Sequence, residues 1–161
     1  VEEECLKILA LYQPVAVDLR FIISALKITN DLERIGDLAV NISRKASALA
    51  AAPPMSIPFD LADMSEKTRA MLRDSLDAMV NMDVNLATEV CGRDDEINRM
   101  KRHIRHQGED LIAADPQHTK QLLRLMAVSR NLERIADLAT NISEDVIYMV
   151  EGAIIRHQQG D

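Results

Sequence analysis

One stretch of this chain occurs twice, and the repetition constrains the fold more than any other feature. Residues 30–43 read NDLERIGDLAVNIS, and residues 130–143 read RNLERIADLATNIS. The segments Leu-Glu-Arg-Ile, Asp-Leu-Ala and Asn-Ile-Ser are unchanged between the two copies. Self-similarity at a fixed offset predicts a fold built from two related units.

Each copy has the pattern of an amphipathic helix, in which residues four apart share a face. The apolar stripes are formed by Ile28, Leu32, Ile35, Ala39, Ile42 and Ala46 in the first copy and by Leu132, Ile135, Ala139, Ile142 and Val146 in the second. On the opposite face, each copy carries a Glu and an Asp one turn apart, followed by an Asn. We expect these acids, Glu33 and Asp37 with Glu133 and Asp137, to face solvent or a partner.

Like charges at this spacing destabilise a helix slightly, by a few tenths of a kcal/mol. A solvated helix face would explain one such pair. The same pair followed by the same Asn in both copies is better explained by a bound cation, which turns the repulsion into binding energy. Oxygen ligands of this kind suit Mg, Mn, Ca or Fe.

The same residues carry a family resemblance. The segments ALKITNDLERIGDLAVNIS and AVSRNLERIADLATNISEDVIYMVEG resemble the two signature helices of the PhoU family of phosphate-uptake regulators. The resemblance extends from Val1 to about Gly152 and includes the linkers. It implies an all-α fold of two three-helix-bundle repeats.

Composition agrees with a helical bundle, because the chain is 47% hydrophobic but only 2% aromatic, with no Trp and five Gly. The formal net charge of −7 argues against nucleic acid as the principal partner. Cys5 and Cys91 are too isolated for a disulfide framework and suit a reducing compartment. No apolar run is long enough to span a membrane. We therefore expect a cytoplasmic protein that meets membranes only through its partners.

Prolines and capping residues divide the chain into helices. They predict the end of a helix at 1–12 and helices at 15–51, 61–81, 84–91, 95–114 and 116–150, with N-caps at Asp60, Asp83, Asp94 and Asp115. Residues 1–52 then form the C-terminal part of the first repeat, 53–60 a Pro-rich linker, 61–152 the second repeat and 153–161 a flexible tail.

The first repeat is incomplete in this division, because it has only part of its second helix and all of its third. The apolar stripe of the 15–51 helix is therefore left partly uncovered, at about 1.5–3 kcal/mol for each exposed Leu or Ile. We expect the sequence to be a fragment, or a further chain to supply the missing helix, and we expect self-association.

The PhoU resemblance also implies metal sites, since PhoU proteins bind multinuclear clusters, often of iron, through Glu/Asp-x-x-x-Asp motifs. Glu33 and Asp37 match the third-helix motif of the first repeat, and Glu133 and Asp137 match that of the second. Asp94 and Asn98 match a second-helix motif, in which Asn98 stands where Asp is usual. The corresponding motif of the first repeat would lie upstream of Val1. Zn, Mn and Mg are alternatives to iron, and the sites can be empty.

Other charged residues have simpler explanations beside functional ones. Helix capping and the helix dipole account for Asp94, Asp95 and Glu96 without any metal. The basic stretch is either a solvated face or a contact for an acidic partner or phosphate; it comprises Arg99, Lys101, Arg102, His103, Arg105 and His106. We expect Arg34 and Arg134 to form ion pairs between helices.

The resemblance implies a non-enzymatic regulator that couples the phosphate ABC transporter to a sensor histidine kinase and restrains the phosphate-starvation response. Two alternatives stay open: a metal-dependent oxidase or phosphohydrolase, and a helical scaffold that binds no metal. A buried di-iron oxidase is not favoured, because the chain has no Glu-x-x-His motif.

Overall fold

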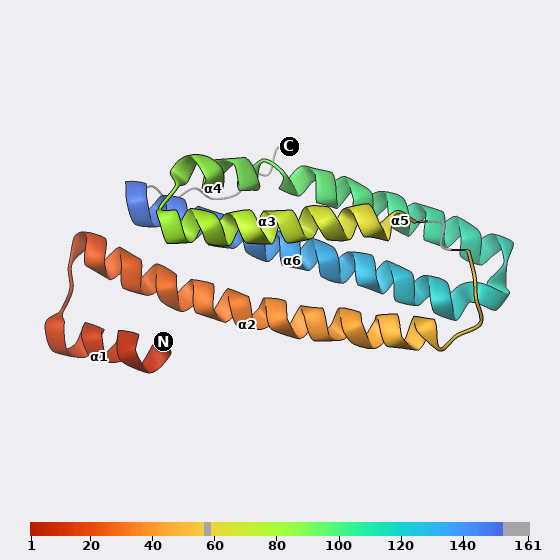
Figure 1. The fold of residues 1–161 in the computed structure, drawn as a ribbon, viewed down its shortest axis with the longest axis horizontal. Coiled ribbons are helices and arrows are strands. Elements are labelled where there is room, and N and C mark those ends of the chain that lie inside the picture. Colours follow the sequence, from red (N-terminus) through yellow and green to blue (C-terminus); the bar gives the residue numbers. More distant parts are fainter. Residues whose placement is uncertain (57–58, 153–161) are drawn as a thin grey trace.

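Helices and their connections make up the described part of the chain, residues 1–56 and 59–152, in a computed structural model (Figure 1). In chain order they are α1 (Glu2–Tyr12), α2 (Ala16–Ala50), α3 (Leu61–Asn81), α4 (Val84–Cys91), α5 (Asp94–Ala114), the short 3-10 helix η1 (Pro116–His118) and α6 (Thr119–Glu151). The predicted all-α class is confirmed. The predicted tail, 153–161, lies outside the described residues.

Most helix ends lie where capping residues predict them. The Asp60 carboxylate accepts a hydrogen bond from the backbone N–H of Asp63 at 2.9 Å, and Asp83 accepts one from Leu86 at 3.0 Å. These bonds satisfy donors that the first helical turn leaves unpaired. Gly152, with a φ of 70°, ends α6 in the left-handed conformation that glycine adopts readily.

The predicted N-cap at Asp94 is wrong. Arg93 precedes α5 with φ −88° and ψ −13°, and Gly92 before it has φ −71° and ψ −13°. Because both residues keep nearly helical backbone angles, the chain enters α5 without an extended capping residue. The Asp94 side chain instead accepts a hydrogen bond of 2.7 Å from the Asn98 amide.

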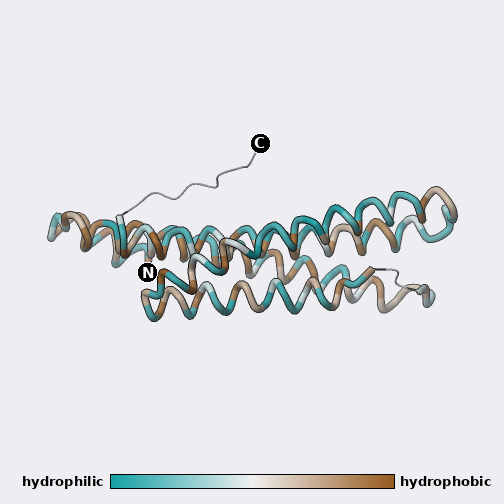
Figure 2. The backbone as a smooth tube through the Cα atoms, turned by 90° about the horizontal axis from the view of Figure 1, so that it is seen from above, coloured by the Kyte–Doolittle hydropathy of each residue, from teal (hydrophilic) through white to brown (hydrophobic). Residues whose placement is uncertain are grey.

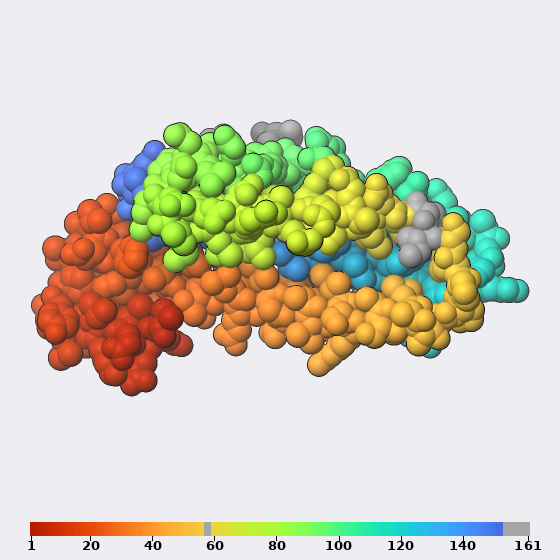
Figure 3. Space-filling model, viewed as in Figure 1, coloured from red at the N-terminus to blue at the C-terminus, as the bar shows by residue number. Residues whose placement is uncertain are grey.

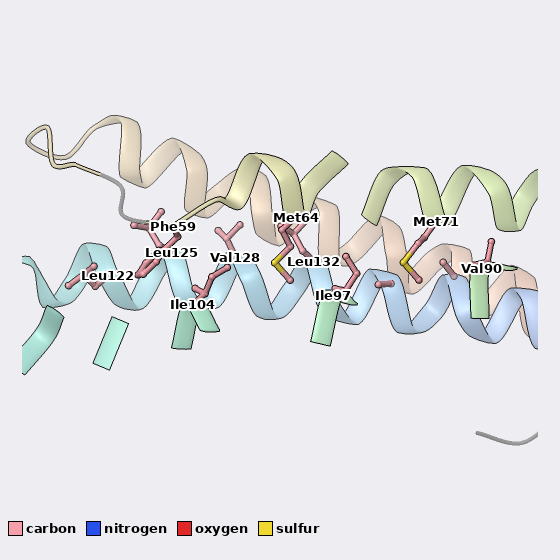
Figure 4. Packing of buried hydrophobic residues seen from close by; sticks show 12 residues of the cluster. Phe59, Met64, Met71, Val90, Ile97, Ile104, Leu122, Leu125, Val128 and Leu132 are labelled. Carbon is pink, nitrogen blue, oxygen red and sulfur yellow. The ribbon is translucent and has the colours of Figure 1, made fainter. Parts of the chain in front are cut away.

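Helix α6 is the centre of the bundle and contacts α2, α3, α4 and α5 (Figure 1). It carries seventeen buried residues, whereas α2, of similar length, carries five. Figure 4 shows how the core fills: Met64 of α3, Ile97 and Ile104 of α5, and Leu125 and Leu132 of α6 point toward one another. One of the two repeated helices therefore holds the core together, and the other covers one side of it.

A glycine of α5 leaves room for a methionine of α6. A Cβ placed on Gly108 would lie 2.6 Å from the Sδ atom of Met126, closer than side-chain atoms normally approach. The Met126 side chain therefore packs directly over Gly108.

The two repeated helices, α2 and α6, pack against each other in opposite directions. Lys27 of α2 forms an ion pair of 3.0 Å with Asp145 near the end of α6, and Arg124 near the start of α6 donates to the carbonyl of Ala48 at 3.3 Å. Ile35 and its counterpart Ile135 belong to the same buried cluster. The contact thus brings equivalent parts of the two copies together.

The face of α2 turned away from α6 is largely uncovered, as predicted. Figure 3 shows α1 against one end of α2, with the outer surface of α2 open along the rest of its length, and Figure 2 shows apolar positions distributed along the helices. Leu32 is 40% exposed, while its counterpart Leu132 is 6% exposed. The expected apolar stripe is therefore buried in α6 and only partly buried in α2.

No helix within residues 1–56 and 59–152 is both long enough and apolar enough to cross a membrane.

The unequal burial of the two copies predicts unequal mutational costs. Leu132→Ala should lower the free energy of unfolding by about 2–5 kcal/mol, because it opens a cavity in the core, whereas Leu32→Ala should cost less than about 1 kcal/mol. Urea unfolding of both variants measures the difference. Equal losses would contradict the central position of α6.

Candidate functional site

The acids of the second copy lie against α5. Asp137 of α6 lies close enough to Asp94, in the first turn of α5, for their side chains to share a hydrogen bond. Asn98, one turn along α5, donates its amide to Asp94. Glu133, one turn before Asp137, is in contact with Lys101 of α5. The structure thus brings together all four residues predicted for the second-repeat site.

The prediction that the repeated acids face outward holds only for the first copy. Glu33 and Asp37 are exposed on α2. Glu133 is 13% exposed at its side chain and is paired with Lys101, and Asp137 is half-buried. The difference follows from packing, because α5 covers this face of α6 and no described helix covers the equivalent face of α2.

The surroundings of Asp137 in the second copy disfavour its negative charge. Burial, together with the nearby carboxylates of Glu133 and Asp94, raises the pKa of Asp137 to about 6, while Lys101 acts in the opposite direction. A carboxyl group with a pKa this close to neutrality changes its charge when the pH shifts by about one unit. A cation bound beside it would remove the repulsion.

Asp37 of the first copy lines a groove of about 380 Å³ between α2 and α6, together with Arg34, Arg134 and its own counterpart Asp137. Glu33 is not among the residues that line this groove. Within the described residues, the first copy therefore offers one pair of exposed carboxylates and no closed site.

The residues around Asp137 fit a hard cation in their chemistry and only partly in their arrangement. Three carboxylates and an amide are the oxygen ligands that such cations prefer. Among the residues described here, however, no three His, Cys, Asp or Glu side chains stand together as a ready ligand set. Glu133 is also already paired with Lys101. Metal binding at this site would require Lys101 to leave Glu133, and it would favour the ionised form of Asp137.

Sequence reasoning missed the polar contacts between α2 and α6. Arg34, expected to pair between helices, pairs with Asp31 of its own helix at 3.1 Å. The ion pair between helices is Lys27 with Asp145, residues that lie 118 positions apart, so no local pattern marks it. Burial raises the pKa of both Asp31 and Asp145.

The fold and its repeated acids match a known family. The PhoU domain matches residues 1–46 and 61–146, which include both copies of the repeated stretch and α5. The chain belongs to the PhoU family. The match confirms the resemblance seen in the sequence.

Individual PhoU proteins are similar to this chain over most of its length. The phosphate-specific transport system accessory protein PhoU homolog of Aquifex aeolicus is 39% identical over 158 residues, which cover 98% of this chain and 72% of that protein. The crystal structure of PhoU from Pseudomonas aeruginosa superposes with a TM-score of 0.89 at 36% identity, covering 94% of this chain and 73% of that one. The regulatory protein PhoU of Streptococcus pneumoniae gives a TM-score of 0.82 at 25% identity, with coverages of 96% and 72%.

The raised pKa of Asp137 predicts a pH-dependent loss of stability. Between the unfolded value of 3.8 and the folded value of about 6, the unfolded chain releases a proton that the folded chain keeps. Stability therefore falls as the pH rises through this range. Asp137→Asn should raise the free energy of unfolding by about 1–2 kcal/mol at about pH 7.5 and leave it unchanged near pH 4.

Urea unfolding in metal-free buffer at several pH values measures this gain. Asp37→Asn, the same change at the exposed counterpart, is the matched control and should have little effect. A stability of Asp137→Asn that stays at or below the wild-type value at neutral pH would contradict the prediction.

Proposed function

We propose that the chain is a non-catalytic, cytoplasmic regulator of phosphate uptake. It acts as an accessory protein of a phosphate-specific transport system and restrains uptake and phosphate-starvation signalling when phosphate is plentiful. Its partners are the phosphate ABC transporter and a sensor histidine kinase. The observation that carries the proposal is the PhoU match on both sides of the Pro-rich linker, together with a relative named for this accessory role.

The shape of the molecule suits a protein that works by contact. Helices α2 and α6 have 35 and 33 residues, so each is about 50 Å long and offers an extended face. Apolar side chains are exposed along α1 and α2, including Val17 at 60%, Phe21 at 45% and Val40 at 48%. Val17 and Phe21 lie one turn apart and share a face of α2, and exposed apolar patches mark interaction sites. We assign this surface to partner binding and self-association.

The proposal includes a regulatory metal at the second-repeat site. Asp94, Glu133 and Asp137 would hold a hard cation, with Asn98 as an amide oxygen ligand; iron is the first choice, and Mn, Zn or Mg are alternatives. The motivation is that Asp137 lies near Asp94 and Glu133, and that burial and these two carboxylates raise its pKa. Glu33 and Asp37 form half of a second site that needs further oxygen ligands.

The regulatory role predicts repression in a cell. In a bacterial host that lacks its own PhoU protein, this chain should lower a phosphate-starvation reporter at high phosphate and co-purify with the transporter. Phe21→Ser should weaken both effects, because it disrupts the exposed surface of α2. Leu123→Ser changes a side chain that is 53% exposed on α6 and serves as the control. Normal repression by Phe21→Ser would contradict the assigned surface, and no repression by the wild-type chain would contradict the role.

The metal site predicts a loss of bound metal that is specific to one repeat. After reconstitution with Fe²⁺ or Mn²⁺, the Glu133→Gln/Asp137→Asn variant should retain less metal than the wild type when measured by elemental analysis. The Glu33→Gln/Asp37→Asn variant changes the equivalent residues of the first copy and should retain the metal of the second-repeat site.

The Lys101→Met variant should bind the ion more tightly than the wild type, by about tenfold, because Glu133 loses its competing cation. Equal metal content in the wild type and the Glu133/Asp137 variant would reject the site.

A further inference from the structure

The contact between α2 and α6 has a groove near each of its two ends, and the two grooves differ in charge. One is lined by Lys27 of α2 and by three acids, Asp31, Glu144 and Asp145. The other, which we call the basic groove, is defined by six cations from α2, α5 and α6: Lys45, Lys101, Arg102, Arg105, Arg130 and Arg134. Among its described lining residues, Glu133 is the one acid.

The repeat explains how the basic groove differs from the acidic one. Residues one hundred positions apart are equivalent in the two copies. Where one end has Asp31, the other has Asn131, and where one end has Asp145, the other has Lys45; likewise, Arg130 takes the place of Asn30. Arg130 and Lys45 therefore make this groove more basic than the equivalent acidic one, whereas Arg134 has the counterpart Arg34 in the first copy and the other cations come from α5.

Most of this positive charge has no counter-ion among the described residues. Lys101 pairs with Glu133, and Arg105 pairs with Glu109 at 2.8 Å. In the part of the chain that the structure describes, no carboxylate lies within ion-pair distance of Arg102, Arg130, Arg134 or Lys45. Four uncompensated cations in a chain with a net charge of −7 concentrate a local positive field that attracts anions.

The neutral lining also suits a small anion. Asn131 is 9% exposed, and its side-chain N–H₂ group has no hydrogen-bond partner among the described residues, which leaves buried donors beside the groove. The groove has a volume of about 760 Å³, within the usual range for small-molecule sites. Its described lining has no aromatic side chain to stack on a nucleobase, and Met126 and Ala127 are its only apolar residues. A protein interface would normally have a more apolar centre.

We propose that the basic groove binds an anion with several phosphoryl groups, such as pyrophosphate or tripolyphosphate. Arginine guanidinium groups pair with phosphate oxygens through two parallel hydrogen bonds. Arg130 and Arg134 on α6 lie one turn apart, about 6 Å along the helix, and Arg102 of α5 and Lys45 of α2 line the same groove. Several unpaired cations spread over one groove match a chain of phosphoryl groups better than a single phosphate. This binding goes beyond the proposed regulatory role, which does not require it.

Calorimetric titration of the chain with phosphate, pyrophosphate and tripolyphosphate tests the proposal. EDTA in the buffer prevents a metal ion from bridging the anion to the acidic site. We expect tripolyphosphate to bind at least about tenfold more tightly than phosphate, and raised salt to weaken it. Arg102→Gln/Arg130→Gln should weaken tripolyphosphate binding by about tenfold or more, because each change removes a charged hydrogen-bond donor.

The control is Arg73→Gln/Arg99→Gln, which removes the same charge from two exposed arginines outside the groove and should leave the affinity unchanged within about twofold. Circular dichroism checks that both variants are folded. Equal weakening in the two variants would show a response to net charge only and overturn the proposal. Tighter binding of a poly-glutamate peptide, lost in Arg102→Gln/Arg130→Gln, would also overturn it by assigning the groove to an acidic protein segment. If tripolyphosphate at about 1 mM does not bind, the proposal is overturned as well.

Discussion

The burial of α6 on several sides is the constraint on which the rest of the structure depends. Four helices pack on it, and twelve of its seventeen buried residues belong to the two core clusters. Its sister α2 has nearly the same sequence in the repeated stretch but is covered on one side only. Similar residues therefore meet different surroundings, and a leucine that is core in one copy is surface in the other.

This asymmetry also divides the electrostatics of the two copies. Glu33 and Asp37 remain in water, where charge is well screened. Glu133 and Asp137 are pressed against α5, where Lys101 neutralises one carboxylate and burial raises the pKa of the other. The packed copy therefore holds the carboxyl group with the raised pKa, and the exposed copy offers the larger open surface. A regulator that works by contact can use both properties.

The sequence predicted most of the helices correctly, but it predicted less of the structure of the candidate site. Helix periodicity and breakers predicted α3 and α4 at their observed bounds, and capping chemistry predicted Asp60 and Asp83, because these are local effects within a few residues. The prediction failed at Asp94, where nearly helical angles at Gly92 and Arg93 removed the need for a cap. The convergence of Asp94, Asn98, Glu133 and Asp137 followed from the family resemblance, whereas their burial did not.

The sequence by itself determined the helices, the repeat and the residue types available at each site, since these depend on neighbours along the chain. Only the tertiary structure decided which copy became the core, that Lys101 lies on Glu133, and that Lys27 meets Asp145 from 118 positions away. It also gathered Lys45, Arg102 and Arg130 from three helices into one groove. Burial and Coulomb energy depend on distances in space, and a linear pattern does not contain those distances.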